Sequence, residues 1–111
     1  MKQMPEELPS LSPEQIAEVA DVLRLLGEPS RLRILLACLT EPAPVGELAA
    51  RVRIPRSLVS HHLRLLRASR LLRAERRGKQ VIYSPLDERV RCIVVDLAHH
   101  VLIEPEDGEE G

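Results

Sequence analysis

Two pairs of adjacent histidines are the residues in this chain with the clearest capacity for chemistry. They are His61 and His62 in "SLVSHHLRLL", and His99 and His100 in "DLAHHVLIE". Imidazole binds zinc, nickel and copper, and it also titrates near neutral pH. Each pair could therefore bind a metal ion, contact another partner, or only pack.

The residues around the two pairs point to different roles. Leu65 and Leu66 follow the first pair one helical turn later, so no further ligand lies beside it and a metal role is not expected. The second pair lies in a series, Asp96, His100 and Glu104, whose members recur every fourth residue. This spacing places the three side chains on one face of a helix and makes the second pair the candidate metal site.

Charge is strongly segregated along the chain, although the net charge is only −1. Residues 51–79 contain ten arginine and lysine side chains and a single acidic residue, Glu75. Acidic residues gather near both ends, and "EPEDGEEG" is typical of a disordered tail. A solvated helix face would carry compensating acids, so the basic middle predicts a surface that binds phosphates, as in nucleic acids.

The 111 residues suffice for one domain, and hydrophobic periodicity divides it into helices and a hairpin. A loose arm is expected over 1–11, the folded domain over 12–103 and the acidic tail over 104–111. Ser12, Pro13 and Gln15 predict a capped helix start, and Gly27 predicts its end. Further helices are expected from Pro29 to the "TEPAP" stop, in "VGELAARV", and over 56–68.

A short turn over 53–55 joins two of these helices, because their apolar residues must share one core. The pair is predicted to be a helix-turn-helix. The period then changes to strand-like alternation on both sides of Arg77 and Gly78, which indicates a basic hairpin, or wing. With a final helix from Asp87 to about Ile103, the expected fold is mainly α: a winged helix-turn-helix of order α-α-α-α-β-β-α.

The last helix has a wide apolar face, and such a face at the end of a small domain needs a partner. The core is aliphatic, with Tyr83 as the single aromatic residue. We therefore expect a homodimer formed through the terminal helices, with the following interface residues: Val90, Ile93, Val94, Leu97 and Val101.

Several functional classes are disfavoured. A glycine-rich phosphate loop, a Ser/His/Asp set and an HExxH motif are absent from the sequence, so an enzyme is not expected. No apolar run reaches the length of about 18 residues that spans a membrane. The first residues do not read as a secretory signal, and Cys38 and Cys92 lie far apart in apolar patterns. The expected location is cytoplasmic.

Residues 16–101 resemble the ArsR/SmtB family of bacterial winged-helix regulators. The resemblance rests on "LLGEPSRLRILLACL", on "ELAARVRIPRSLVSHHLRLLRASRLLRAERRGKQVIYS" and on the spacing between them. It implies a homodimer that binds operator DNA when free of inducer and that a metal ion typically releases. It also implies that His62 packs in the recognition helix, whereas His61 could face the DNA groove.

The exposed polar residues of the recognition helix and the wing are expected to contact DNA. Arg56 is the candidate for reading guanine, because its fork matches O6 and N7. Ser57 and Ser60 are expected at phosphates, and two protomers should read an inverted repeat. The full expected set is Arg56, Ser57, Ser60, His61, Arg64, Arg67, Arg76, Arg77 and Lys79.

The family's metal sites are matched only in part. "PAPVGELA" contains no cysteine where some members bind soft ions such as arsenic, cadmium or lead. At the terminal-helix site, Asp87 and His100 match ligand positions, but Arg89 replaces a histidine and Ile103 replaces the fourth ligand. An incomplete nickel or zinc site of Asp87, His99, His100 and Glu104 is one hypothesis. In the other, Arg89 pairs with Glu104 or Asp96 across the dimer.

The expected function is a sequence-specific DNA-binding regulator, a repressor, whose operator binding is modulated by nickel or zinc. The alternative is a metal-independent regulator controlled by a partner protein or by thiol oxidation at Cys38 or Cys92. Within the family, the Arg- and Ala-rich composition suggests an actinobacterial nickel-linked regulator of superoxide dismutase genes. Such a regulator could also use a co-regulator protein.

Overall fold

The computed structural model describes residues 7–103, which form five helices and one antiparallel hairpin. In chain order the elements are α1 (Pro13–Leu26), α2 (Pro29–Thr40), α3 (Val45–Val52), α4 (Arg56–Ala68), β1 (Leu72–Arg77), β2 (Gln80–Pro85) and α5 (Glu88–Leu102). The predicted order is confirmed. The expected arm is described only over 7–11, which are exposed and carry no helix or strand. The predicted acidic tail, 104–111, lies outside the described residues.

Local signals set the helix ends. The Ser12 hydroxyl accepts from the Gln15 N–H at 3.1 Å, and the Gln15 side-chain oxygen accepts from the Ser12 N–H at 2.9 Å, so the predicted capping box is present. Glu28 caps α2 in a similar way, because its carboxylate accepts from the backbone N–H of Arg31 at 2.8 Å. Both helices therefore satisfy some of the N–H groups that a first turn leaves unpaired.

The helix-turn-helix is formed by α3 and α4. Arg53 ends α3 with a φ of 59°, in the left-handed region, and Pro55 then precedes α4. A left-handed arginine costs about 1–2 kcal/mol, and the buried contacts on either side of the turn offset it. Leu48 of α3 and Val59 of α4 are both fully buried in one core, as predicted.

The wing is a two-stranded hairpin whose register pairs Ala74 with Tyr83 and Arg77 with Gln80. Gly78 supplies the positive φ, 62°, that the tight turn requires. Two backbone hydrogen bonds join Ala43 to Tyr83, with N···O distances of 3.3 and 3.0 Å. The base of the wing is therefore tied to the segment between α2 and α3.

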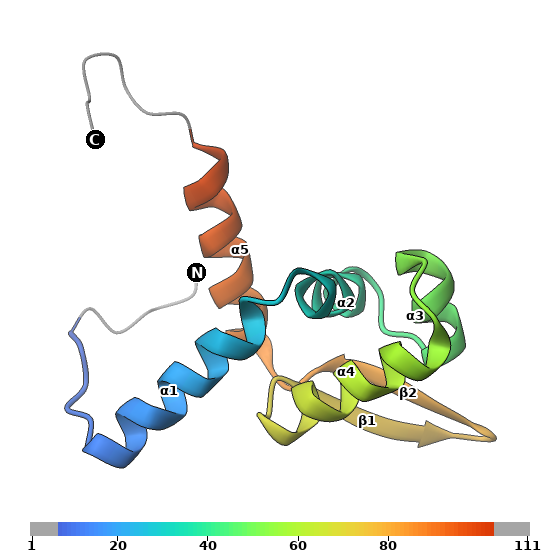
Figure 1. Ribbon diagram of the computed structural model, residues 1–111, viewed down its shortest axis with the longest axis horizontal. Coiled ribbons are helices and arrows are strands. Elements are labelled where there is room, and N and C mark those ends of the chain that lie inside the picture. The colour runs from blue at the N-terminus through green and yellow to red at the C-terminus, as the bar shows by residue number, and fades with distance from the viewer. Residues whose placement is uncertain (1–6, 104–111) are drawn as a thin grey trace.

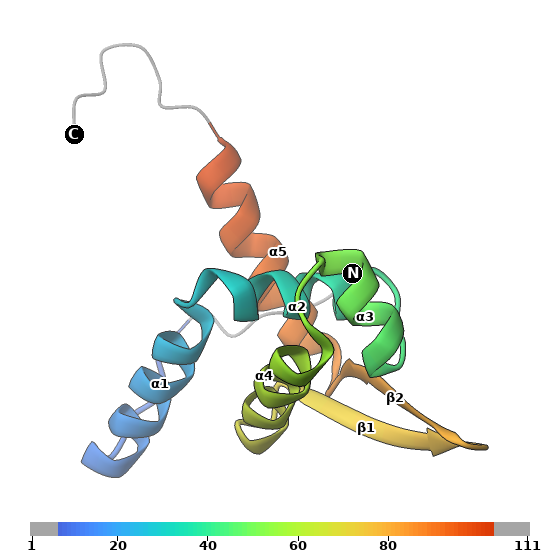
Figure 2. The ribbon, with the colours of Figure 1, turned by 45° about the vertical axis from the view of Figure 1, so that its right-hand side comes forward.

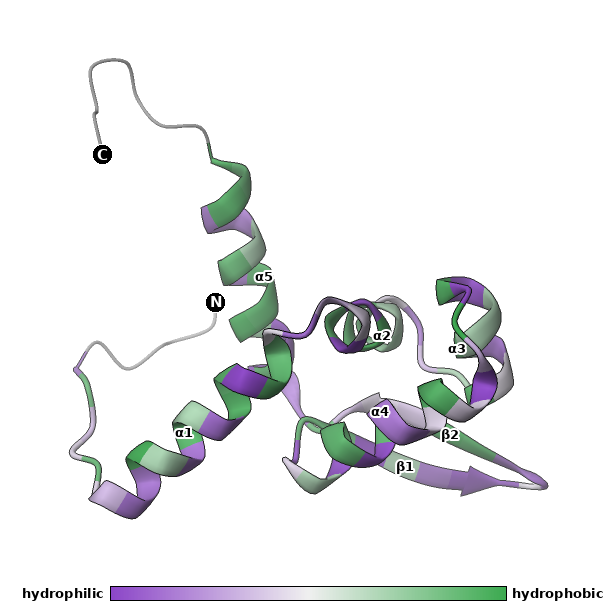
Figure 3. Cartoon of the chain, in the orientation of Figure 1, coloured by the Kyte–Doolittle hydropathy of each residue, from purple (hydrophilic) through white to green (hydrophobic). Residues whose placement is uncertain are grey.

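The core lies between α2, α3, α4, the base of the wing and the first half of α5. In both ribbon views, α1 and α5 project from this body (Figures 1 and 2). Colouring by hydropathy shows apolar residues along the projecting part of α5 and in alternation along α1 (Figure 3). No helix among residues 7–103 combines the length and the apolar character needed to cross a membrane.

Candidate nucleic-acid interface

The recognition helix α4 separates its apolar side from its polar side. Val59, Leu63 and Leu66 are buried, and they recur at the helical spacing that faces the core. On the other side, Arg56, Ser57, His61, Arg64 and Arg67 are exposed and Ser60 is half-buried. The exposed groups are guanidiniums, hydroxyls and an imidazole, which are side-chain types able to hydrogen-bond to phosphates and to base edges.

The wing adds a second basic surface. Arg76, Arg77 and Lys79 are exposed at its tip, where the strands turn at Gly78. Arg77 contacts Glu75 at 3.3 Å, but both side chains are more than half exposed, so this ion pair leaves the cation accessible. The structure thus brings the predicted residues into two groups on α4 and on the wing.

A hollow of about 520 Å³ lies between α4 and strand β2 of the wing. It is lined by Ser60, Arg64, Arg67 and Ala68 of α4 and by Tyr83 of β2. Two guanidiniums, a serine hydroxyl and a phenol around one hollow can donate hydrogen bonds to phosphate oxygens. This arrangement suits Arg64 and Arg67 for the DNA backbone, as expected for residues farther along the helix.

Arg51 belongs to the basic segment, but its side chain makes contacts within the protein that the charge pattern did not predict. Arg51 donates to the carbonyl oxygen of Glu41 at 2.7 Å and to the carboxylate of Glu47 at 2.9 Å. Its side chain is 26% exposed. Arg33 similarly donates to the carbonyl of Val52, and Arg91 to that of Leu39. These guanidiniums satisfy helix C-terminal carbonyls, which no charge pattern distinguishes from a DNA-facing role.

The two members of the first histidine pair have different environments. His61 is exposed, whereas His62 is 6% exposed and its Nδ1 accepts from Nε of Arg31 at 3.2 Å. Burial lowers the pKa of His62, and the neighbouring Arg31 lowers it further. His62 therefore packs, as expected, but it packs as a neutral hydrogen-bond acceptor for a residue on another helix.

The candidate metal residues on α5 are spread along it. Asp87 is the N-cap of α5: one oxygen accepts from the backbone N–H of Arg89 at 2.9 Å, and the other pairs with the Arg89 guanidinium at 3.3 Å. Asp96, His99 and His100 are exposed farther along the helix, and Glu104 lies outside the described residues. Within 7–103, no three Asp, Glu, His or Cys residues form a group that could hold a metal ion.

The expected dimer residues divide between the core and the surface. Val90 and Val94 are 5% and 8% exposed and pack in the chain's own core. Ile93, Leu97 and Val101 are 53%, 55% and 72% exposed. Two apolar grooves, of about 250 and 370 Å³, run beside them between α5 and the helices α1 and α2.

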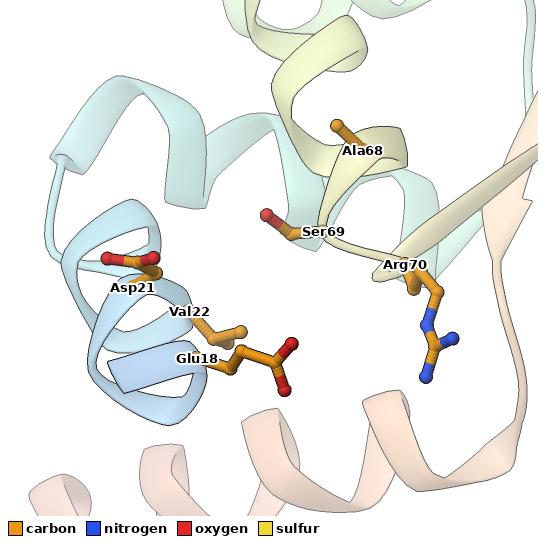
Figure 4. Close-up of a pocket in the computed structure, with 6 residues that line it drawn as sticks. All are labelled: Glu18, Asp21, Val22, Ala68, Ser69 and Arg70. Carbon is orange, nitrogen blue, oxygen red and sulfur yellow. The ribbon is translucent and has the colours of Figure 1, made fainter. Parts of the chain in front are cut away.

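A more polar cleft of about 520 Å³ separates α1 from the end of α4 (Figure 4). Glu18, Asp21 and Val22 line it from α1, and Ala68, Ser69 and Arg70 line it from the other side. Asp21 is already paired with Arg24 at 2.6 Å. Of the two carboxylates that line the cleft, Asp21 therefore already has a cationic partner on its own helix.

The cysteines differ in accessibility. Cys38 is fully buried, and burial raises the pKa of its thiol to about 12. The reactive thiolate is therefore scarce at neutral pH, which argues against oxidation at Cys38 as a control. Cys92 on α5 is half-buried and carries a free thiol.

Comparison with known proteins places this geometry in a family. Residues 28–74 match the family model for bacterial regulatory proteins of the arsR family. A transcriptional repressor SmtB homolog of Synechocystis sp. is 36% identical over 101 residues, covering 91% of this chain and 75% of that protein. The transcriptional regulator NmtR of Mycobacterium tuberculosis is 37% identical over 90 residues, covering 81% and 75%.

The solved structures agree with the sequence matches. The crystal structure of NolR from Sinorhizobium fredii superposes with a TM-score of 0.72 at 32% identity, covering 84% of this chain and 96% of that one. None of these matches confirms the narrower hypothesis of a nickel-linked regulator of superoxide dismutase genes. With an exposed polar recognition helix, a basic wing and relatives of this identity and coverage, the chain belongs to the ArsR/SmtB family of winged helix-turn-helix transcriptional regulators, and it is a DNA-binding regulator rather than an enzyme.

Proposed function

We propose that the protein is a homodimeric repressor that binds an inverted-repeat operator in the bacterial cytoplasm. The observation that carries the proposal is the exposed polar side of α4, with Arg56, Ser57 and His61, beside a basic wing tip. In helix-turn-helix proteins the N-terminal residues of the second helix reach base edges, and dimers read half-sites about one helical turn apart.

The apolar surface on α1 and α5 supports the homodimer. Ile16, Val19 and Leu23 of α1 are about half exposed, as are Ile93 and Leu97 of α5. Large aliphatic side chains exposed together along two helices mark a protein interface. A second copy of the same face would cover both helices and bring two recognition helices into one assembly.

We further propose that a transition metal modulates operator binding through α5. His99, His100 and Asp96 lie exposed near its C-terminal end, and neutral imidazole with carboxylate suits nickel or zinc. The Asp87 carboxylate is already paired with the Arg89 guanidinium. The metal ligands would therefore come from the residues nearest the C-terminal end of α5. Glu104, which lies outside the described residues, would be the third ligand in the series Asp96, His100 and Glu104, whose members recur every fourth residue.

The alternative is a regulator without its own metal site, and the ion pair between Asp87 and Arg89 favours it. An arginine stays protonated and cannot ligate a metal ion. Control would then come from a partner protein, or from oxidation of the half-buried Cys92.

Two measurements test these proposals together. A duplex selected from a random library should be shifted by the protein as a two-fold complex, and its affinity should fall steeply with salt. Calorimetry of the protein with nickel, zinc and cobalt, followed by a gel shift of the same duplex, tests the metal response. Tight metal binding that changes operator affinity supports the repressor with a metal site, and operator binding indifferent to all three ions supports the alternative.

A further inference from the structure

Helix α4 has two histidines, and only the exposed His61 is proposed to contact DNA. The other, His62, is buried. It is 6% exposed, and along α4 it follows the exposed His61 and precedes the buried Leu63. Its Nδ1 accepts a hydrogen bond from Nε of Arg31, 31 positions earlier in the chain. This bond joins the recognition helix to the first turn of α2.

Arg31 has a second connection, to α1. Its terminal guanidinium nitrogen donates to the carbonyl oxygen of Leu25 at 3.0 Å, in the last turn of α1. Its own backbone N–H donates to the Glu28 carboxylate at 2.8 Å, which fixes the start of α2. A single guanidinium therefore holds together the end of α1, the start of α2 and the middle of α4.

The contact requires one protonation state of His62. A guanidinium is always a donor, so the Nδ1 it meets must carry no proton, and the proton of the neutral imidazole is on Nε2. A doubly protonated imidazole has no acceptor, and it would place a second cation against Arg31. The charged groups that act on His62 are Arg31 and His61, which lower its pKa as burial does, and Glu28, which opposes them.

We infer that Arg31 is a positioning residue for the recognition helix, acting through neutral His62, so that operator binding weakens as His62 takes up a proton. The inference rests on the DNA-binding function and adds a control to it. Base contacts tolerate displacements of only about 0.5 Å, and Ser60 and His61 adjoin His62 on the same helix. Loss of the bond removes this link between α4 and the end of α1, so the position of α4 is less tightly fixed although every DNA-facing side chain is chemically unchanged.

The test compares the pH dependence of operator affinity in the full chain and in His62→Asn. The probe is a duplex selected by the wild-type protein from a random library at about pH 8. Asparagine places an oxygen acceptor where Nδ1 was and does not titrate. Between about pH 8 and 5 the affinity of the wild type should fall progressively as His62 takes up a proton, whereas the affinity of His62→Asn should stay flat over the same range.

Matched variants separate positioning from other effects. His61→Asn makes the same substitution at the exposed neighbour, and it should keep the loss of affinity on acidification. Arg31→Met should weaken binding about tenfold at pH 8 and flatten the pH profile. Its salt dependence should match that of the wild type, because the part-buried guanidinium of Arg31 is engaged by His62 and by the Leu25 carbonyl within the protein. Arg31→Lys keeps a cation but not the forked guanidinium that reaches both acceptors. Its affinity for the duplex should therefore lie between that of the wild type and that of Arg31→Met.

Circular dichroism and urea unfolding show whether each variant folds. If His62→Asn does not fold, the flattened profile of Arg31→Met or Arg31→Lys decides the question. Equal pH profiles for the wild type and the folded His62 or Arg31 variants would overturn the inference, as would wild-type affinity and sequence preference in Arg31→Met. Failure of the wild type to bind any duplex at about pH 8 would instead contradict the DNA-binding function itself.

Discussion

At the scale of single residues, His62 also links folding to pH. Its pKa is lowered in the folded chain from an ordinary value of 6.5, mainly by burial. The unfolded chain then binds more protons than the folded chain between the lowered pKa and 6.5, so the free energy of unfolding rises with pH across that window. Stability should therefore fall as the pH drops below about 6.5 and through the folded pKa.

Urea unfolding at a series of pH values measures this dependence. His62→Asn should remove the part of the slope that lies just below about pH 6.5. Glu28 acts in the same direction but at lower pH, because the N–H of Arg31 lowers the pKa of its carboxyl below the ordinary 4.5. An unchanged slope near pH 6 in His62→Asn would show that His62 has the same pKa folded and unfolded.

Arg51 and Arg77 belong to the same basic segment but should respond differently to substitution. Arg51→Ala removes donors from the Glu41 carbonyl and the Glu47 carboxylate, and it should lower stability by about 1–2 kcal/mol. Arg77→Ala should leave stability unchanged and reduce the slope of log affinity against log salt by about 1. Urea unfolding and salt-dependent gel shifts of both variants check this, and the opposite pattern would reverse the assignment.

Arg56 begins α4, and its guanidinium lies against Gly46 of α3, at 3.4 Å from where a Cβ would stand. Arg56→Ala should relax specificity at one base position, at a cost of about 1–3 kcal/mol for the preferred duplex. Binding to a set of duplexes with single base changes measures this. A uniform loss for operator and random DNA would assign Arg56 to phosphates.

At the scale of elements, α5 should carry any metal response. The double variant His99→Ala with His100→Ala should weaken nickel or zinc binding, while operator binding without metal stays near wild type. Arg89→His replaces the cation that occupies Asp87 with a ligand, so metal affinity should rise by about 10–100-fold. Calorimetry measures both. Unchanged metal affinity in both variants would leave α5 as a structural and dimerisation helix and favour the metal-independent regulator.

The wing and α4 act as separate elements of the interface. The wing is tied to the body through Ala43 and Tyr83, whereas α4 is tied through Arg31 and His62. Substitutions at the wing tip should therefore change affinity for all duplexes alike, because this element supplies cations. Changes in the position of α4 should alter sequence preference, because the proposed base contacts come from this element.

At the scale of the whole molecule, the exposed apolar faces predict the response of the dimer. Leu97 is 55% exposed and lines the larger groove, so Leu97→Asp should leave the chain folded but monomeric. Val94→Asp should unfold the chain, because Val94 is 8% exposed in its own core and would bury an unpaired charge. Analytical ultracentrifugation and circular dichroism distinguish the two results.

Val95→Asp is the matched control for the dimer. Val95 is 39% exposed on α5 and lines neither apolar groove, so the dimer should persist in this variant. A Leu97→Asp protein that remains dimeric, or that still binds both half-sites tightly as a monomer, would place the interface elsewhere.

Much of the fold follows from local sequence. The capping box at Ser12, the left-handed Gly78 and the apolar spacing of α4 each act within a few residues, so their outcome could be predicted from the chain alone. The polar side of α4 was predictable for the same reason. Its residues occupy the helix positions that the apolar stripe leaves free.

Tertiary structure decided which partners those residues meet. Charge patterning counts Arg51 with Arg77, yet Arg51 turns to the carbonyls that end α2 while Arg77 extends into solvent. Periodicity places Val94 and Leu97 on one apolar face, but within one chain only Val94 of these two is buried in the core. The contact of Arg31 with His62 joins helices that are distant in sequence, and no local pattern specifies it. Periodicity and caps depend on neighbours along the chain, whereas burial and hydrogen-bond partners depend on which segments the packed core brings together.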